Sequence, residues 1–489
     1  MRYSYYVEGN RLCETLAEAT AFVAQSQDEA LNKDLLQSSQ KAWRSMKKIF
    51  EKDEKISHYP EVLDSLKQCE IFCQKVLQDF SLLPSYINQV QDFFDRFCQQ
   101  VSITYRIVFL SDLGGKWDSM RSVYEEYCRR PDCEVTVVLM PIFRQIQKNG
   151  KVEQEVVYED YFTSMGIPYI EYTKYDLKKD CPDLVFTSNP YDSTVLPQFY
   201  AEEIAKVSRL VYVPYFSAHI LDENAPMALC QLPIYECAWK VITQSEKTKN
   251  LHNKYGKKHG RNVLVTGLPK WDEAIYLKRN GLLERERILE WEEKIAGHKT
   301  ILWTTWYDLS RSSVKYWEQI LGYLENNPEF VLIWRPHPMT IPVTKLYFPE
   351  KYAQLQKIIE EAKSHSNMVL DQNASYRASF AYSDGMITDI SSMTIQYLLQ
   401  DKPVLWIYSD GMGLTNESVI DPKWMQKAMS TEKIWRFFDQ IKQGKDDCQF
   451  LRKQVIEADM PLADGNSGKR VVESLFLSMY EEDGVSINN

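Results

Sequence analysis

"SDGMITDISSMTIQYLLQDKPVLWIYSD", residues 383–410, contains a complete strand–helix–strand unit. A short apolar strand leads through a polar step, Thr388 to Ser392, into an amphipathic segment, and a second apolar strand follows. An apolar run, a stretch with helical periodicity and another apolar run are typical of a parallel sheet with crossover helices. The polar step holds an acid and two serines but no glycine, so its side chains need an explanation.

The same alternation occurs in two series along the chain. The first series begins at residue 104, and the second begins after about residue 298. This pattern predicts two α/β domains, each with a doubly wound parallel sheet. The charged helical stretch 276–299 is the expected linker. The first series contains TYRIVFLSD, CEVTVVLM, IPYIEY, DLVFTS, LVYVPYF, KVITQS and NVLVTG, and the second contains TILWTTW, FVLIWRP, MVLDQN, DGMITD and PVLWIY.

The chain before the first strand has a different character. No glycine occurs between Gly9 and Gly114, and apolar residues recur there at helical spacing. We therefore expect a helical region over residues 1–100, a first Rossmann-like domain over 101–280 and a second over 281–489. Lys41, Arg44 and Lys48 fall on one face of a predicted helix. That face either touches an anionic membrane surface or is simply solvated, and the solvated face is favoured.

Composition narrows the classes of function. The net charge of −10 over 489 residues argues against a general nucleic-acid binder. The ten cysteines form no Cys-x-x-Cys pair, which argues against a zinc site and a disulfide framework. The start of the chain lacks a signal-peptide pattern, and no apolar run approaches the roughly 20 residues of a membrane-spanning helix. We expect a cytoplasmic protein, and nothing in the sequence requires a metal or a cofactor.

Candidate site residues follow the predicted strands, because ligands of open parallel sheets bind beyond the carboxyl ends of the strands. Asp112 follows the first strand, and it is either an orienting residue or, as favoured, a turn or cap residue. Ser391 and Ser392 either cradle a phosphate at a helix N-terminus or only cap that helix, and capping is favoured on this stretch alone. The remaining candidates are His219, Arg335, His337, Thr388 and Asp389.

Arg335 and His337 stand on either side of a proline directly after an apolar strand. An arginine paired with a titratable imidazole resembles a phosphate clamp. Several other signatures are missing, namely the dinucleotide fingerprint G-x-G-x-x-G, the P-loop, the G-x-S-x-G elbow and the H-E-x-x-H zinc motif. Kinases and hydrolases of those types are therefore disfavoured.

Five segments together resemble the CDP-glycerol glycerophosphotransferase family, whose members build teichoic acids and related polymers. The most specific is the ITD-x-SS step followed by Asp-Lys-Pro and another strand. The resemblance covers roughly residues 104–480. The segments are GLPKWDEAI (267–275), ILWTTWYD (301–308), RPHP (335–338), ITDISSMTIQYLLQDKPVLW (387–406) and ADGNSGKRVVESL (463–475).

The resemblance implies a GT-B arrangement, in which two Rossmann-like domains face each other and the N-terminal helical region precedes them. The first domain would bind the acceptor and the second the CDP-linked donor. The implied reaction moves glycerol phosphate, or a related polyol phosphate, from CDP-glycerol or a similar donor to a hydroxyl of a lipid-linked or glycan acceptor, with release of CMP. It would serve cell-wall or capsule synthesis at the inner face of the plasma membrane, without nucleic acid.

The resemblance also implies roles for the candidate residues. Donor binding falls to Arg335, Thr388, Asp389, Ser391 and Ser392. The catalytic candidates are His337, His219 and Asp112.

The sequence departs from the family at one turn. Polymerase-type members carry Trp-His-Gly-Thr in the first domain, and its histidine is expected to be the base. The corresponding strand end here is VYVPYFSAH (211–219), in which His219 comes three residues later. The alternatives are therefore a GT-B glycosyltransferase that uses a nucleotide sugar, and an inactive scaffold subunit of a glycopolymer assembly complex.

Overall fold

The computed structural model describes residues 1–148, 151–158, 160–218, 230–310, 312–389, 391–407 and 419–485. The chain forms two compact units. Unit 1 comprises Met1–Ile107, Cys128–Val135 and Leu475–Asn489, and unit 2 comprises Val108–Tyr127 and Thr136–Ser474. The domain boundaries expected near residues 100 and 280 stay predictions.

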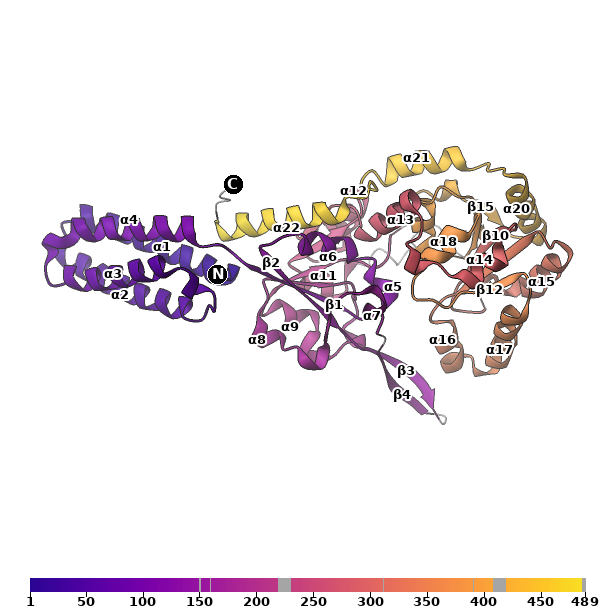
Figure 1. Ribbon diagram of the computed structural model, residues 1–489, viewed down its shortest axis with the longest axis horizontal. Coiled ribbons are helices and arrows are strands. Elements are labelled where there is room, and N and C mark those ends of the chain that lie inside the picture. The colour runs from indigo at the N-terminus through magenta and orange to yellow at the C-terminus, as the bar shows by residue number, and fades with distance from the viewer. Residues whose placement is uncertain are drawn as a thin grey trace. The chain divides into compact units, whose positions relative to one another are not determined.

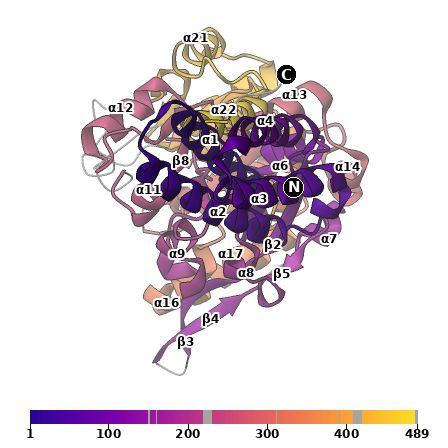
Figure 2. The same cartoon turned by 90° about the vertical axis from the view of Figure 1, so that its left-hand side faces the viewer.

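The predicted N-terminal helical region is present, as four helices that lie side by side (Figures 1 and 2). Their aromatic side chains interlock: Trp43 meets Phe93 edge-on at 5.3 Å, and the Phe50 and Phe97 rings stack at 5.5 Å. A Cβ at Gly9 would come within 3.1 Å of the Phe97 ring, so the helices pack closely at this glycine. The helices are α1 (Tyr3–Gln25), α2 (Glu29–Phe50), α3 (Pro60–Val76) and α4 (Leu83–Gln100), with 3₁₀ turns at Ile56–His58 and Phe80–Leu82.

The basic face of α2 is exposed, as both alternatives for it require. Lys41, Arg44 and Lys48 are all exposed. Arg44 forms an ion pair with Glu70 at 3.4 Å, so part of the positive charge is balanced within the bundle. An exposed pair of this kind contributes little to stability.

The first sheet has seven strands in the order β5-β2-β1-β6-β7-β8-β9. From β1 the chain adds β2 and β5 on one side, and β6 to β9 follow on the other. The switch point of this sheet therefore lies between β1 and β6. The strands are β1 (Tyr105–Ser111), β2 (Cys133–Leu139), β5 (Ile170–Glu171), β6 (Leu184–Thr187), β7 (Arg209–Tyr212), β8 (Lys240–Thr243) and β9 (Val263–Val265).

The second sheet has six strands in the order β12-β11-β10-β13-β14-β15, and its paired strands are parallel. Both faces are buried: Leu302 and Ile333 belong to one core cluster, while Trp303 and Leu332 belong to another. Burial on both faces explains why these strands read as continuous apolar runs. The strands are β10 (Lys299–Thr305), β11 (Phe330–Pro336), β12 (Met368–Leu370), β13 (Gly385–Thr388), β14 (Val404–Ile407) and β15 (Gln426–Ala428).

Helices connect the strands and cover the sheets, as the sequence predicted. With the first sheet go α5 (Gly114–Trp117), α6 (Arg121–Cys128), α7 (Phe162–Met165), α8 (Leu177–Asp180), α9 (Ala201–Ala205), α11 (Pro233–Cys237) and α12 (Glu246–Tyr255). Then follow α13 (Pro269–Asn280), α14 (Leu289–Ile295), α15 (Trp317–Asn326), α16 (Thr340–Tyr347), α17 (Pro349–Ser364), α18 (Arg377–Tyr382), α19 (Met393–Leu398), α20 (Thr431–Gln443), α21 (Gln449–Asp459) and α22 (Ser467–Asp483).

An antiparallel hairpin was not anticipated from the sequence. It consists of β3 (Ile142–Lys148) and β4 (Lys151–Val157), and it extends away from the first sheet in both views (Figures 1 and 2). The short strand β15 was also missed.

Candidate functional site

The two sheets each present a switch point at which the loops diverge and ligands of such folds bind. At the first switch point Asp112 follows β1 directly. At the second, Trp306 follows β10 and the polar step that begins with Thr388 ends β13. These residues are the starting points for the candidate site.

Asp389 holds the neighbouring loop in place. Its carboxylate accepts hydrogen bonds from the backbone N–H of Trp306 at 2.7 Å, the hydroxyl of Ser312 at 2.9 Å and the backbone N–H of Ser313 at 3.0 Å. The residue is only 3% exposed, and burial raises the pKa of its carboxyl while the hydrogen bonds oppose that rise. Asp389 therefore fixes the loop after β10, and this structural role explains why an aspartate occupies the position.

Thr388 is likewise used inside the protein. Its hydroxyl lies 2.7 Å from that of Thr304 on β10 and is fully buried. The phosphate-binding prediction for Thr388 and Asp389 thus receives no support from their contacts. Both residues help to form the switch point, but neither presents an unbonded polar atom to it.

Ser391 and Ser392 lie at the start of α19. The Ser391 hydroxyl accepts a hydrogen bond from the backbone N–H of Met393 at 3.2 Å, which is a local turn of the kind that caps helices. Ser392 is the formal N-cap residue, but its side chain makes no cap bond. Both residues are half-buried. Of the polar step, these two hydroxyls are the ones nearest to solvent.

Arg335 is committed to the loop that follows β12. Its guanidinium pairs with Asp371 at 2.5 Å and donates to the backbone oxygens of Asn373 at 2.9 Å and Ser375 at 3.2 Å. The residue is 8% exposed. Arg335 therefore organises the 371–375 loop, and its charge is largely balanced by Asp371. The predicted direct clamp on a phosphate stays a prediction.

His337 is the candidate that faces open space. Its Nδ1 accepts a hydrogen bond from the backbone N–H of Met339 at 3.0 Å. Burial, and secondarily the charge of Arg335, lowers the pKa of His337 to about 4. The imidazole is therefore neutral at physiological pH, and with Nδ1 accepting, its proton is on Nε2. A role that depends on titration near neutral pH does not fit this environment, whereas donation by Nε2–H does.

A cavity of about 220 Å³ opens beside His337. Arg335, Asp371 and Asn373 contribute to its wall, as does Thr340, whose buried hydroxyl has no hydrogen-bond partner within the described ranges. Sequence reasoning missed Asp371 and Thr340, although Asp371 directly follows an apolar strand and so met the rule used for the other candidates.

His337 also borders the loop that Asp389 anchors. Its ring lies 6.0 Å from the ring of Trp306 and 5.5 Å from that of Tyr307. The structure thus brings His337, Trp306 and Asp389 to one edge of the second sheet.

The candidates of the first domain are only partly described. His219 lies outside the described residues. The chain just before it is firmly held, because Gln244 exchanges two hydrogen bonds of 2.8 Å with the backbone of Ala218, and the indole of Trp271 donates to the hydroxyl of Ser217 at 3.0 Å. Asp112 is buried and pairs with Lys116 at 2.8 Å.

The loops that carry the two sets of candidates contact each other. Gly114, two residues after Asp112, is so close to the 371–375 loop that a Cβ there would lie 3.2 Å from the Cβ of Ala374. A Cβ at Gly115 would lie 3.4 Å from the Ala374 oxygen. The Gly-Gly pair therefore permits close packing and is not part of a dinucleotide fingerprint.

Two of the motifs that the sequence singled out are partners of each other. Asp272, within GLPKWDEAI, accepts hydrogen bonds from the backbone N–H groups of Ser467 at 3.0 Å and Gly468 at 2.8 Å. These are the first residues of α22, in the ADGNSGKRVVESL segment. The two motifs therefore have a structural role, because they hold the start of α22 to α13.

Neither a metal centre nor a membrane span is found in the part of the chain that the structure describes. No group of three or more His, Cys, Asp or Glu side chains there is arranged to hold a metal ion. No helix in the same ranges is both long and apolar enough to cross a membrane. None of the ten cysteines, all of which lie in the described ranges, forms a disulfide bond.

Comparison with known proteins gives one family. A family model described as CDP-Glycerol:Poly(glycerophosphate) glycerophosphotransferase matches residues 230–477, just over half of the chain. No curated protein matches the chain in sequence.

Solved structures support the fold. MnaA of S. aureus, in a co-structure with UDP, is 14% identical with a TM-score of 0.52, over 77% of this chain and 97% of that one. The wall teichoic acid polymerase TagF is 11% identical with a TM-score of 0.50, over 84% and 98%. A TagF variant gives 0.52 over 78% and 90%. At these identities the likeness concerns the fold alone, and it confirms the predicted pair of Rossmann-like domains with a GT-B-like arrangement.

Proposed function

Because the chain belongs to the CDP-glycerol:poly(glycerophosphate) glycerophosphotransferase family, we propose that it moves glycerol phosphate, or a related polyol phosphate, from a CDP-linked donor to an acceptor hydroxyl. The acceptor is lipid-linked or part of a glycan, and CMP is released. The product is a link in a teichoic-acid-type or capsular polymer. We place the reaction at the cytoplasmic face of the plasma membrane, where a lipid-linked acceptor is presented.

The observation that carries this proposal is the position of His337 at the 220 Å³ cavity, which is lined by the ends of β11 and β12 and by α16 and α17. In the reaction, an acceptor oxygen attacks the phosphorus that bears the polyol, and the bond to the CMP oxygen breaks. Negative charge grows on the phosphoryl oxygens and on the leaving CMP. A neutral imidazole with its proton on Nε2 stabilises that charge by donating a hydrogen bond.

The remaining donor contacts in this proposal come from the start of α19. Ser391 and Ser392 lie near the same sheet edge, and both are half-buried, so their hydroxyls would donate to a diphosphate bound there. Arg335 contributes indirectly, because it holds the wall of the cavity through Asp371 and the 371–375 loop. In this proposal the donor nucleotide binds to the second domain and the acceptor to the first.

Donor identity is tested by binding before activity. Thermal shift and calorimetric titration with CDP-glycerol, CDP-ribitol and UDP-N-acetylglucosamine should show tighter binding of a CDP-polyol. Tighter binding of the UDP-sugar would favour a glycosyltransferase instead. Binding of a CDP-polyol without CMP release, in the presence of lipid-linked acceptors, would favour the scaffold alternative.

The role of His337 is tested by substitution. We expect His337→Ala to lower turnover by about 10²-fold, the scale of lost electrostatic help, with the melting temperature unchanged. His337→Gln retains a donor and should keep substantial activity. Its pH profile between 6 and 8 should parallel that of the wild type, because an imidazole with a pKa near 4 is already neutral there.

The matched control is His298→Ala, an exposed histidine of the same domain, which should leave turnover unchanged. Equal loss in the Ala and Gln variants of His337 would point to proton transfer instead of hydrogen-bond donation. Wild-type turnover in both would remove His337 from the site.

A further inference from the structure

The first turn of α13 (Pro269–Asn280) buries a run of polar side chains. Lys270, Trp271, Asp272 and Glu273 follow one another, and each is at most 7% exposed. Lysine, aspartate and glutamate are rarely buried unless they are paired. Successive residues of a helix point about 100° apart, so these side chains reach different neighbours. This part of α13 is therefore a junction between segments of the chain.

The first two of these side chains hold a turn of the first domain. The ammonium of Lys270 donates to the backbone oxygen of Tyr215, and the indole of Trp271 donates to the hydroxyl of Ser217 at 3.0 Å. Residues 215–218, which we call the β7 turn, follow β7 at the strand end where the family resemblance places the expected base. The start of α13 thus fixes the β7 turn, on the acceptor side of the proposed reaction.

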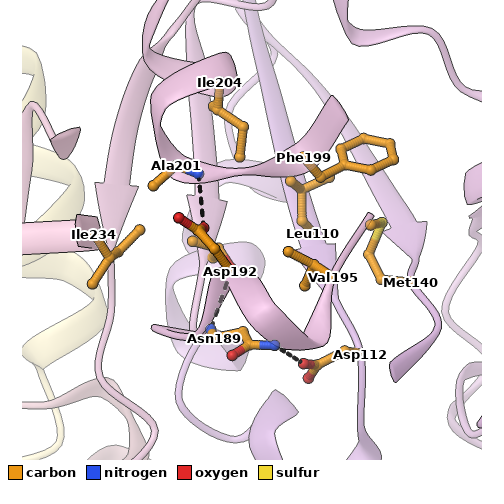
Figure 3. Close-up of a pocket in the computed structure, with 11 residues that line it drawn as sticks. Leu110, Asp112, Met140, Asn189, Asp192, Val195, Phe199, Ala201, Ile204 and Ile234 are labelled. Carbon is orange, nitrogen blue, oxygen red and sulfur yellow. Dashed lines mark hydrogen bonds between the residues drawn. The ribbon is translucent and has the colours of Figure 1, made fainter. Parts of the chain in front are cut away.

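The β7 turn is also joined to the end of β1. The ammonium of Lys116 lies 5.2 Å from the centre of the Tyr215 ring and pairs with Asp112 at 2.8 Å. The side-chain amide of Asn189 donates to the same carboxylate at 2.7 Å, a bond that Figure 3 shows. Asp112 and the β7 turn therefore belong to one connected set of side chains.

Glu273, one turn along α13, holds the 371–375 loop. Its Oε2 accepts from Nη1 of Arg377 at 3.3 Å, and its backbone oxygen accepts from the same nitrogen at 3.3 Å. The backbone N–H of Arg377 donates to the hydroxyl of Ser375, the last residue of the loop, at 3.2 Å. Arg335 donates to the backbone oxygen of Ser375 as well. The loop that contributes to the wall of the donor cavity is therefore held by both Arg335 and α13.

The same oxygen of Glu273 also binds a helix of the first domain. Nη1 of Arg121, on α6, donates to Oε2 at 3.2 Å. Burial, and then the negative charge of Asp118, raises the pKa of Glu273, while Arg121 and Arg377 oppose the rise. Buried ion pairs often contribute little net stability, because both charges lose their hydration. The cluster is therefore better explained by the single arrangement that it specifies than by a gain in stability.

The two attachments lie close together on one helix. Lys270 and Glu273 are three residues apart, which corresponds to about 4.5 Å along the helix axis. The two sides also meet directly: a Cβ at Gly115, in α5, would lie 3.4 Å from the oxygen of Ala374 in the 371–375 loop. A single turn of α13 therefore fixes the β7 turn relative to the wall of the donor cavity.

We propose that α13 aligns the acceptor side with the donor side, and that Lys270 and Glu273 are the positioning residues through which it does so. This inference rests on the proposed function. Neither side chain lines the donor cavity, so the affinity for the donor does not depend on them. Transfer needs the acceptor oxygen in line with the phosphorus, and a small displacement of either partner lowers the rate. Lys270 and Glu273 thus act on turnover through the segments that they hold.

The test separates turnover from donor binding. Glu273→Gln removes the charge that binds the two arginines, and Lys270→Met removes the bond to the β7 turn. With CDP-glycerol and a lipid-linked acceptor, we expect each variant to lower kcat for CMP release by about tenfold, while the Kd for CDP-glycerol stays unchanged. Glu273→Gln keeps an oxygen that accepts a hydrogen bond, so it should retain more turnover than Glu273→Ala.

Lys278→Met and Glu293→Gln are the matched controls. Both residues are exposed, on α13 and α14, and we expect wild-type turnover from both variants. Hydrogen exchange gives a local readout, and it should increase at the β7 turn in Lys270→Met and at residues 374–377 in Glu273→Gln. Because the two substitutions disturb different segments, one well-folded variant is sufficient for the test.

Wild-type turnover in both variants, even with a lower melting temperature, would reduce the two residues to packing and overturn the proposal. A loss of CDP-glycerol affinity as large as the loss of turnover would mean that they shape the donor site, which also overturns it. If the wild type binds CDP-glycerol but releases no CMP with any lipid-linked acceptor, the proposed function itself fails, and this inference with it.

Discussion

Single residues in the polar step after β13 divide into those that build the site and those that face it. Thr388 and Asp389 are buried and bonded to the strand and loop of β10, whereas Ser391 and Ser392 are half-buried at the start of α19. A glycine would leave the 306–313 loop without its carboxylate partner. Asp389 is therefore needed at this position, because the loops after β10 and β13 leave neighbouring strands in different directions and its carboxylate connects them.

Asp389→Ala tests this structural role. The substitution leaves the buried backbone N–H groups of Trp306 and Ser313 without an acceptor, which should cost about 2 to 4 kcal/mol of unfolding free energy. Urea denaturation of the variant and of Ser392→Ala, which should be nearly neutral, provides the comparison. If Asp389→Ala is fully stable but loses affinity for CDP-glycerol, Asp389 binds the donor and its structural role is contradicted.

Sequence alone identified these residues as candidates. It could not show which of them are open to a ligand and which are already hydrogen-bonded inside the protein. The rule that ligands bind beyond strand ends selected His337, Asp389 and the serines as candidates for one sheet edge. Whether a polar side chain is open or already bonded depends on which loop lies beside it, and that is decided by strand order. The order places β10 next to β13, a pairing between residues about 80 positions apart that no local pattern reveals.

At the scale of elements, the strands were predictable where both faces are buried and less so elsewhere. β10 and β11 read as continuous apolar runs because the two core clusters cover them. The strands of the hairpin β3–β4 mix polar and apolar residues without a regular period, and the sequence Asn-Gly between them is a strong hairpin signal that could have found it. β15 has only three residues, two of them polar, and carries no such signal.

The start of α22 gives the prediction at this scale. Asp272 on α13 accepts from the first two backbone N–H groups of α22 and from the hydroxyl of Ser122 at 2.9 Å, so it acts as an N-cap supplied from a distant segment. Asp272→Ala should lower the unfolding free energy by about 2 kcal/mol, the upper range for a lost cap, and increase hydrogen exchange at the first turn of α22. Asp28→Ala, which removes an exposed cap from α2, should cost less. Unchanged exchange at Ser467 and Gly468 would contradict the capping role.

At the scale of the whole molecule, one of the contacts between the two halves of the proposed reaction is a contact between two loops. Arg335 draws the 371–375 loop together on the donor side, and Ala374 of that loop packs against Gly114 on the acceptor side. A family resemblance identifies the residues on each side but not this contact, because it depends on the absence of a side chain. The position of Asp112 relative to the donor cavity therefore depends on a glycine.

Gly114→Ala tests the importance of this contact for transfer. The new Cβ would lie 3.0 Å from the ring of Tyr161 and 3.2 Å from Ala374, so the loops must separate by a few tenths of an ångström. Phosphoryl transfer depends on the alignment of acceptor oxygen and phosphorus, and we expect turnover to fall roughly tenfold while CDP-glycerol affinity is retained. Gly322→Ala is the matched control, because no atom lies within 4 Å of a Cβ at that helical position and the change should be neutral or stabilising. Loss of donor affinity in Gly114→Ala would mean that the contact shapes the donor cavity, and wild-type turnover with a lower melting temperature would reduce it to packing. Slower transfer with intact binding is the outcome that a reaction shared between two facing domains requires.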